Sequence, residues 1–143
     1  MSKSNVTEND LVKFYANAVA MPSYGANLYV HLHTADPGEA GTSATNAATY
    51  TSYARVTKLR DNTQWTICDA DGTTNASGSA FKNTTDVVFP ECTGIADSES
   101  QTHASLCDNS GQILYSGALT AAILITNLTT PYFPAGTLIF KED

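Results

Sequence analysis

Apolar residues near the start of the chain follow a helical period. They fall three and four positions apart, on one face of an α-helix: Leu11, Phe14, Tyr15, Ala18 and Val19. Thr7 stands before Glu8 and Asp10, an arrangement typical of an N-cap followed by acidic residues in the first turn. Pro22 disfavours helical geometry at Met21. The pattern predicts a short amphipathic helix within an N-terminal segment, residues 1–22.

After this segment, apolar and polar positions alternate with the period of β-strands. Residues 28–34 are the clearest case, with Leu28, Val30 and Leu32 on one face and Tyr29, His31 and His33 on the other. Similar stretches predict further strands at Tyr53–Leu59, Gln64–Cys68, Ser79–Phe81, Asp86–Phe89, Thr102–Cys107, Gln112–Leu119, Ala122–Leu128 and Thr137–Lys141.

Turn sequences separate these strands. Asp71-Gly72, Asp108-Asn109-Ser110-Gly111 and Pro134-Ala135-Gly136 are typical of tight turns. Many short strands with this spacing indicate a mainly β protein, an antiparallel, jelly-roll-like β-sandwich with the helix closing one end. We expect a single domain over residues 1–143, with a long surface loop over residues 36–52.

The alternation also predicts the core of the sandwich. The inward positions of the expected strands are Leu28, Val30, Leu32, Val56, Trp65, Phe81, Val88, Leu106, Leu114 and Leu138.

Charge narrows the possible partners. The charged fraction is 15% and the net charge is −7, from few acidic and still fewer basic residues. Nucleic acids are bound through clustered Lys and Arg, so we expect no nucleic-acid partner. No stretch resembles a secretory signal or a membrane span, and we expect a protein that contacts no membrane and is made in a cytoplasm. Cys68, Cys92 and Cys107 lack metal-site spacing and are expected to be buried thiols.

Reactive motifs are scarce. His31 and His33 lie two positions apart, a spacing that metal sites use, and His103 could approach them, but the sequence marks no further ligand. Asp69-Ala70-Asp71-Gly72 lacks the later carboxylates of a calcium loop. The Gly-x-Ser-x-Gly motif of serine hydrolases is absent. We expect no catalytic residue, no metal site and no cofactor, and therefore a protein that is not an enzyme.

The loop after residue 34 has an unusual composition. Asp36, Pro37 and Gly38 stop the strand, and Glu39 is followed by small residues up to Tyr50. A lid over a small-molecule site needs side chains that reach a ligand, which this loop lacks. We predict that the loop and the helix form a protein contact surface made of Leu11, Phe14, Tyr15, Asp36, Pro37, Gly38, Glu39 and Tyr50. We expect the loop to gain its order from a partner, and Arg55 to pair with Asp36 or Glu39.

Five quoted segments, in order, resemble a group of small tailed-bacteriophage structural proteins. They are "LYVHLHTADPGEAGT", "YTSYARV", "NTTDVVFPECTG", "THASLCDNSGQILYSGALT" and "FPAGTLIF". The shared pattern is a Thr-x-Asp-Pro-Gly turn, a Tyr-Ala-Arg strand and a Gly-Ala-Leu strand, and it covers the chain from about Leu11 to Phe140. The chain departs from it at Cys107, where an aromatic residue is common, and in the insert Gly94–Gln101.

The resemblance implies a component of a virion. Such proteins are often labelled tail-fibre or minor structural proteins, and others of this size are capsid cement. The role that it implies foremost is that of a capsid decoration protein on the capsid exterior. Such a protein would contact the major capsid protein and would pair with copies of itself as a homotrimer. The alternative within the virion is a tail- or fibre-associated module that meets the host.

A rival class is a carbohydrate- or metal-binding β-sandwich. The residues for such a site would be Tyr29, His31, His33 and Trp65.

Overall fold

The computed structural model describes residues 1–142, which form one helix and ten strands. These are β1 (Ser2–Lys3), α1 (Asn5–Asn17), β2 (Asn27–His33), β3 (Val56–Leu59), β4 (Trp65–Cys68), β5 (Ala80–Asn83), β6 (Val87–Val88), β7 (Ser98–Cys107), β8 (Ile113–Thr126), β9 (Tyr132–Phe133) and β10 (Ile139–Lys141).

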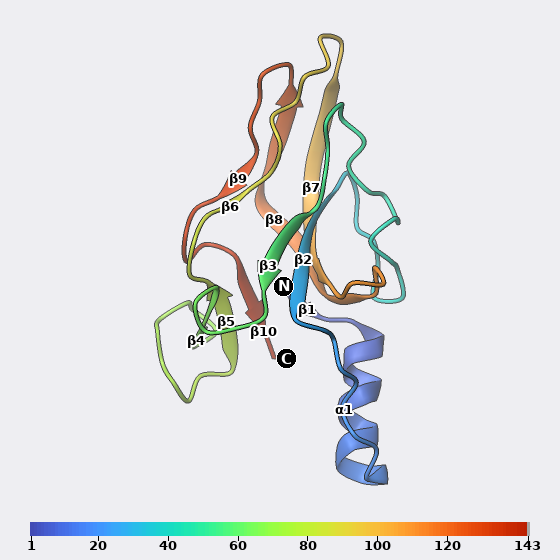
Figure 1. Cartoon of the computed structure of the whole chain (residues 1–143), viewed down its shortest axis with the longest axis vertical. Coiled ribbons are helices and arrows are strands. Elements are labelled where there is room, and N and C mark those ends of the chain that lie inside the picture. The colour runs from blue at the N-terminus through green and yellow to red at the C-terminus, as the bar shows by residue number, and fades with distance from the viewer. Residues whose placement is uncertain (143) are drawn as a thin grey trace.

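Antiparallel pairing arranges the strands in three sheets. The largest has the order β1-β8-β7-β2-β3, the second the order β10-β5-β4, and β6 pairs with β9. The elongated body carries helix α1 at one end, and the loops before β7 and after β8 lie at the other (Figure 1). A mainly β, antiparallel sandwich with one N-terminal helix is confirmed.

One face of the five-stranded sheet holds the core. Leu28, Val30 and Leu32 of β2 are buried with Leu106 of β7 against side chains of the smaller sheets, among them Trp65, Phe89 and Phe140. Phe81 and Phe140 stack with ring centroids 5.1 Å apart, and Trp65 meets Phe140 edge to face at 5.8 Å. Aromatic side chains therefore fill the space between the layers.

The predicted core is correct at most positions but wrong at Val88. Val56 and Phe81 pack against the core while partly exposed, and Val88 is 51% exposed whereas Val87 is fully buried. Because neighbours on a strand face opposite ways, the two-residue strand β6 presents the other face to the core.

The long strands differ from the prediction. The strands predicted over residues 112–119 and 122–128 form one strand, β8, and half of the insert Gly94–Gln101 belongs to β7. Gln101 pairs with Ile123 and His103 with Ala118, so one residue of β7 faces four of β8 in an irregular bulge. The bulge lies where the sequence predicted a break between two strands.

Helix α1 begins and ends earlier in the chain than predicted. Ser4, not Thr7, is its N-cap, and the helix ends at Ala18, whose φ of 54° is left-handed. The chain leaves the helix before Pro22 can end it. No helix in residues 1–142 has the length and apolar character needed to cross a membrane.

Candidate interaction surface

Helix α1 is fastened to the sandwich by its first turn. The Ser4 hydroxyl donates to the Ile113 carbonyl at 2.6 Å, and the Thr7 hydroxyl donates to the Leu114 carbonyl at 3.0 Å. Both side chains are buried, and Ser4 also accepts from the Thr7 amide at 3.4 Å. These bonds satisfy β8 carbonyls and the start of the helix together.

Replacing Ser4 with alanine is expected to lower the free energy of unfolding by about 1 to 2 kcal/mol, because a cap and a buried hydrogen bond are lost together. Chemical denaturation measures the change. The matched control is Ser23→Ala, at an exposed serine, which should stay within about 0.5 kcal/mol of the natural chain. Equal effects of the two substitutions would contradict this role for Ser4.

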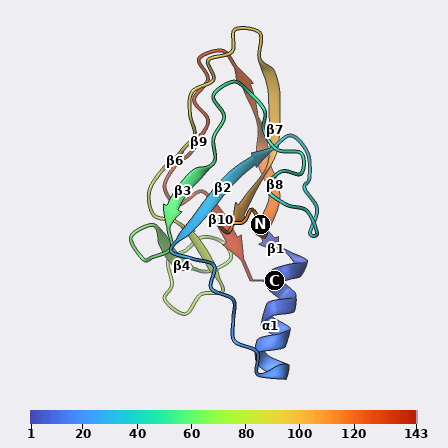
Figure 2. The same cartoon turned by 45° about the vertical axis from the view of Figure 1, so that its right-hand side comes forward.

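The rest of the helix extends away from the sheets (Figure 2). Phe14 is 46% and Tyr15 80% exposed, and Val12 and Val19 are exposed as well. The rings of Phe14 and Tyr15 meet edge to face, with centroids 5.4 Å apart. We name Phe14 and Tyr15 the helix patch. Large exposed aromatic side chains close together are typical of protein contact sites.

Leu11 lies on the same face of the helix as Phe14 and Tyr15 but one turn nearer the sandwich, where it is only partly exposed. It lines an apolar cavity of about 310 Å³ together with Met21, Tyr24, Leu28 and Leu114. The Tyr24 hydroxyl donates to the Asp10 carboxylate at 3.2 Å, and burial raises the pKa of Tyr24 to about 12. The returning chain is thus tied to the helix, and Leu11 points toward the body instead of joining the helix patch.

The loop over residues 36–52 is bonded to the end of β2 and to the turn between β7 and β8. The Thr34 amide donates to the Asn46 carbonyl at 2.8 Å, and the Ala48 amide donates to the Leu32 carbonyl at 2.9 Å. At the other end of the loop, the Ser43 amide donates to the Gly111 carbonyl at 2.9 Å. The loop is therefore ordered by its own chain, contrary to the expectation that a partner supplies its order.

The predicted loop residues divide into two groups. Asp36 and Glu39 are exposed, and the Asp36 carboxylate accepts from the Gly38 amide at 2.8 Å. Pro37 and Tyr50 are buried, and the Tyr50 hydroxyl donates to the Pro90 carbonyl at 3.0 Å. Their side chains face the chain's own interior, which corrects their placement on an outer surface.

The loop and the helix do meet at one point. The Asn5 amide, at the start of α1, donates to the Glu39 carbonyl at 3.3 Å. Arg55, in contrast, joins neither Asp36 nor Glu39: its guanidinium lies 3.7 Å from the centre of the Tyr29 ring. That cation–π contact replaces the predicted ion pair. Whether Leu11, Phe14, Tyr15 and the exposed loop residues bind another protein stays a prediction.

The histidines of β2 lie beneath the loop. His33 is held by the Thr45 carbonyl at 2.8 Å and the Ser105 hydroxyl at 2.7 Å. His31 is buried, and its Nε2 has no hydrogen-bond partner within residues 1–142. Burial, with the nearby charges of His33 and Arg55, lowers the pKa of His31 to about 4. Residues 1–142 contain no group of three His, Cys, Asp or Glu side chains that could hold a metal ion.

Trp65 and the three cysteines, the other residues considered for a binding site, are buried within the chain. Trp65 belongs to the core on the opposite side of the large sheet from Tyr29, His31 and His33, and its indole N–H donates to the Leu59 carbonyl at 3.0 Å. The four residues of the rival sugar or metal site therefore do not converge. Cys68, Cys92 and Cys107 are free and buried, as predicted.

The buried histidine predicts acid sensitivity. Above pH 6.5 His31 is neutral in both the folded and the unfolded chain; between pH 6.5 and about 4 mainly the unfolded chain takes up the proton. The free energy of unfolding should therefore fall as the pH drops through this window, by at most about 1.4 kcal/mol per pH unit for this group. His31→Gln should reduce the slope in denaturation measured from pH 8 to pH 4, and an unchanged slope would contradict the prediction.

Comparison with known proteins adds one match. A family model described as podophage GP4 fiber I protein gp80 matches residues 2–141. No curated protein matches the chain. The matched range includes helix α1 and all ten strands of the described structure.

Proposed function

Because the chain belongs to the podophage GP4 fiber I protein gp80 family and is a structural protein of a phage virion, we propose that it is a fibre-associated module held in the particle by helix α1. The observation that carries the proposal is the helix patch. The first turn of α1 is fixed to β8, whereas Phe14 and Tyr15 extend into solvent.

Helix α1 is held in a fixed orientation relative to the sandwich. A short helix that is free at both ends is marginal in water, but the Ser4 and Thr7 bonds hold one end of α1 in place. Apolar anchors on a preoriented helix fit a groove on a partner, the helix-in-groove mode of recognition. We further propose that the chain acts by contact alone, without a reaction or cofactor. We also propose that it assembles as a homotrimer, and analytical ultracentrifugation would measure the mass of that assembly.

Capsid decoration is the second candidate. The compact sandwich has no fibrous repeat, and the net charge of −7 suits a surface turned away from packaged DNA. In that case the helix patch would contact the major capsid protein. The family description favours the fibre over this alternative.

Separating particles into heads and tails distinguishes the two candidates. We expect an antibody against the chain to detect it in the tail fraction. Detection in the DNA-filled head fraction alone would favour decoration of the capsid, and absence from both fractions would contradict any role in the particle.

A further inference from the structure

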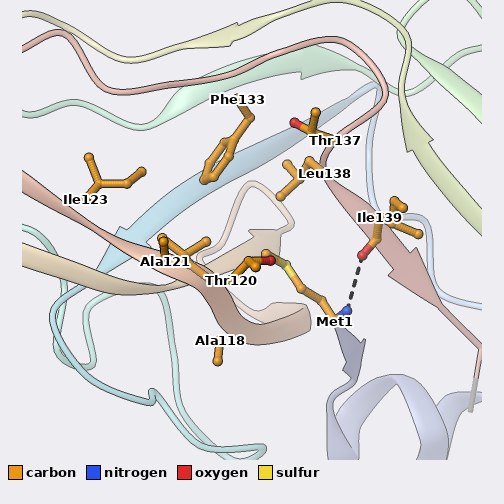
Figure 3. Close-up of a pocket in the computed structure, with 10 residues that line it drawn as sticks. Met1, Ala118, Thr120, Ala121, Ile123, Phe133, Thr137, Leu138 and Ile139 are labelled. Carbon is orange, nitrogen blue, oxygen red and sulfur yellow. Dashed lines mark hydrogen bonds between the residues drawn. The ribbon is translucent and has the colours of Figure 1, made fainter. Parts of the chain in front are cut away.

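A groove opens between β8 and the C-terminal segment at the side of the sandwich. Its volume is about 390 Å³. Figure 3 shows Ala118, Thr120, Ala121 and Ile123 of β8 on one side, and Phe133, Thr137, Leu138 and Ile139 on the other, with Met1 between them.

The N-terminal strand shows what this groove fits. Ser2 and Lys3 pair with Ser116 and Tyr115 on the edge of β8. On its other side, the Met1 amino group donates to the Ile139 carbonyl at 3.2 Å, and the Lys141 amide donates to the Met1 carbonyl at 2.8 Å. An extended chain therefore already lies between β8 and β10, and the groove continues its path past Met1.

Beyond Ser116, the edge of β8 has no strand partner among residues 1–142 on the side away from β7. It also has no charge to repel one, because the chain contains no charged residue from Gln112 to Phe140. The opposite edge of the same sheet differs, since β3 is flanked by the exposed residues Arg55 and Arg60. Charged residues are the usual protection of an edge strand against further pairing.

We propose that an extended, uncharged segment of another virion protein enters this groove, in line with β1, and pairs with β8 between Gly117 and Ile123. An apolar side chain of that segment lies against Ile123, Phe133 and Leu138. The irregular part of β8 between Ala118 and Ile123 runs along this groove. This is β-strand addition, in which main-chain bonds give affinity and the side-chain pocket gives selectivity.

The occupant is another protein rather than a second copy. Within residues 1–142 the long segments outside helices and strands are held by their own chain. Residues 36–52 are bonded to the sheet, and the stretch after α1 is held by the bond from Tyr24 to Asp10. Residues 69–79 are held by the bond from the Asn75 amide to the Ile67 carbonyl, and residues 89–97 by bonds from the Phe89 and Cys92 amides to the Pro131 and Thr129 carbonyls. A second copy therefore has no free extended arm to donate. The inference rests on the proposed function, since it places the partner in the virion.

The test compares two matched lysine substitutions. Thr120 lies in the groove and Thr57 on the β3 edge, and both are exposed, so neither substitution should disturb folding. Thr120→Lys would bury an unpaired charge under the incoming strand, and its incorporation into particles is expected to fall at least about tenfold. Thr57→Lys should be incorporated within about twofold of the natural chain. Equal incorporation of the two variants would overturn the proposal.

Hydrogen exchange on the natural chain tests the same groove without a substitution. Amides between Gly117 and Ile123 should exchange at least about tenfold more slowly in the particle than in the free chain. A photo-crosslinker at position 120 should join the chain to a different virion protein, and a crosslink to a second copy would overturn the choice of occupant. If the chain is in the particle but these amides are unprotected, the groove proposal alone fails. If the chain is missing from particles, both the groove proposal and the proposed function fail.

Discussion

Replacing Leu32 with alanine is expected to lower the free energy of unfolding by about 2 to 5 kcal/mol. Leu32 is fully buried near the end of β2, between the large sheet and the aromatic side chains of the small sheets. The substitution leaves a cavity that rigid neighbours on paired strands fill only in part. Urea or guanidinium denaturation of the purified chain measures the loss.

Val88→Ala is the control for this prediction. Its side chain is half exposed on β6, so the substitution should change the free energy of unfolding by less than about 0.5 kcal/mol. A loss below about 0.5 kcal/mol for Leu32→Ala would mean that β2 faces the other way.

Replacing both Phe14 and Tyr15 with serine is expected to reduce incorporation into particles at least about 30-fold. Aromatic anchors at protein interfaces contribute about 2 kcal/mol or more each, and about 1.4 kcal/mol corresponds to a tenfold change in affinity. Both side chains are exposed in the free chain, so its stability should change little. Quantifying the variant in purified particles, beside its unfolding curve, measures the effect.

The matched control for the helix patch removes two exposed apolar side chains elsewhere. Val88 and Ile95 are 51% and 91% exposed and lie outside α1. The double variant Val88→Ser and Ile95→Ser should enter particles within about twofold of the natural chain. A similar loss of incorporation for both double variants would mean that removing exposed apolar side chains anywhere on the chain has this effect. Phe14 and Tyr15 would then have no special role.

The alternation of apolar and polar residues predicted strands such as β2, in which one face lies against the core and the other beneath the loop over residues 36–52. In β2 every second residue from Leu28 faces the core, and the register with β7 follows from it. The pattern failed where a strand is only two residues long, as at Val87 and Val88, because two positions define no period. It also failed in β8, where a bulge shifts the phase between Ala118 and Ile123.

The loop over residues 36–52 illustrates a different limit. Its small residues offer no periodic signal, so the sequence could not show that the loop covers β2. The buried residues Pro37 and Tyr50 were the available signal, since bulky apolar residues in a polar loop more often pack inward than stand in solvent.

The helix patch was predicted in part. The helical period placed Leu11, Phe14 and Tyr15 on one face, but it did not show that Leu11 lines a cavity at the sandwich while Phe14 and Tyr15 are exposed. The left-handed geometry of Ala18 and the hydrogen bonds of Ser4 and Thr7 to β8 decide how the helix stands. Those bonds depend on strand carbonyls more than 100 positions away, which local sequence patterns do not encode.

A density map of the intact particle would show directly whether helix α1 holds the chain in the fibre. We expect the sandwich in the tail fibre assembly, with Phe14 and Tyr15 of α1 buried against a neighbouring protein. A map that places the chain elsewhere in the particle, or in the fibre with both rings exposed to solvent, would contradict it.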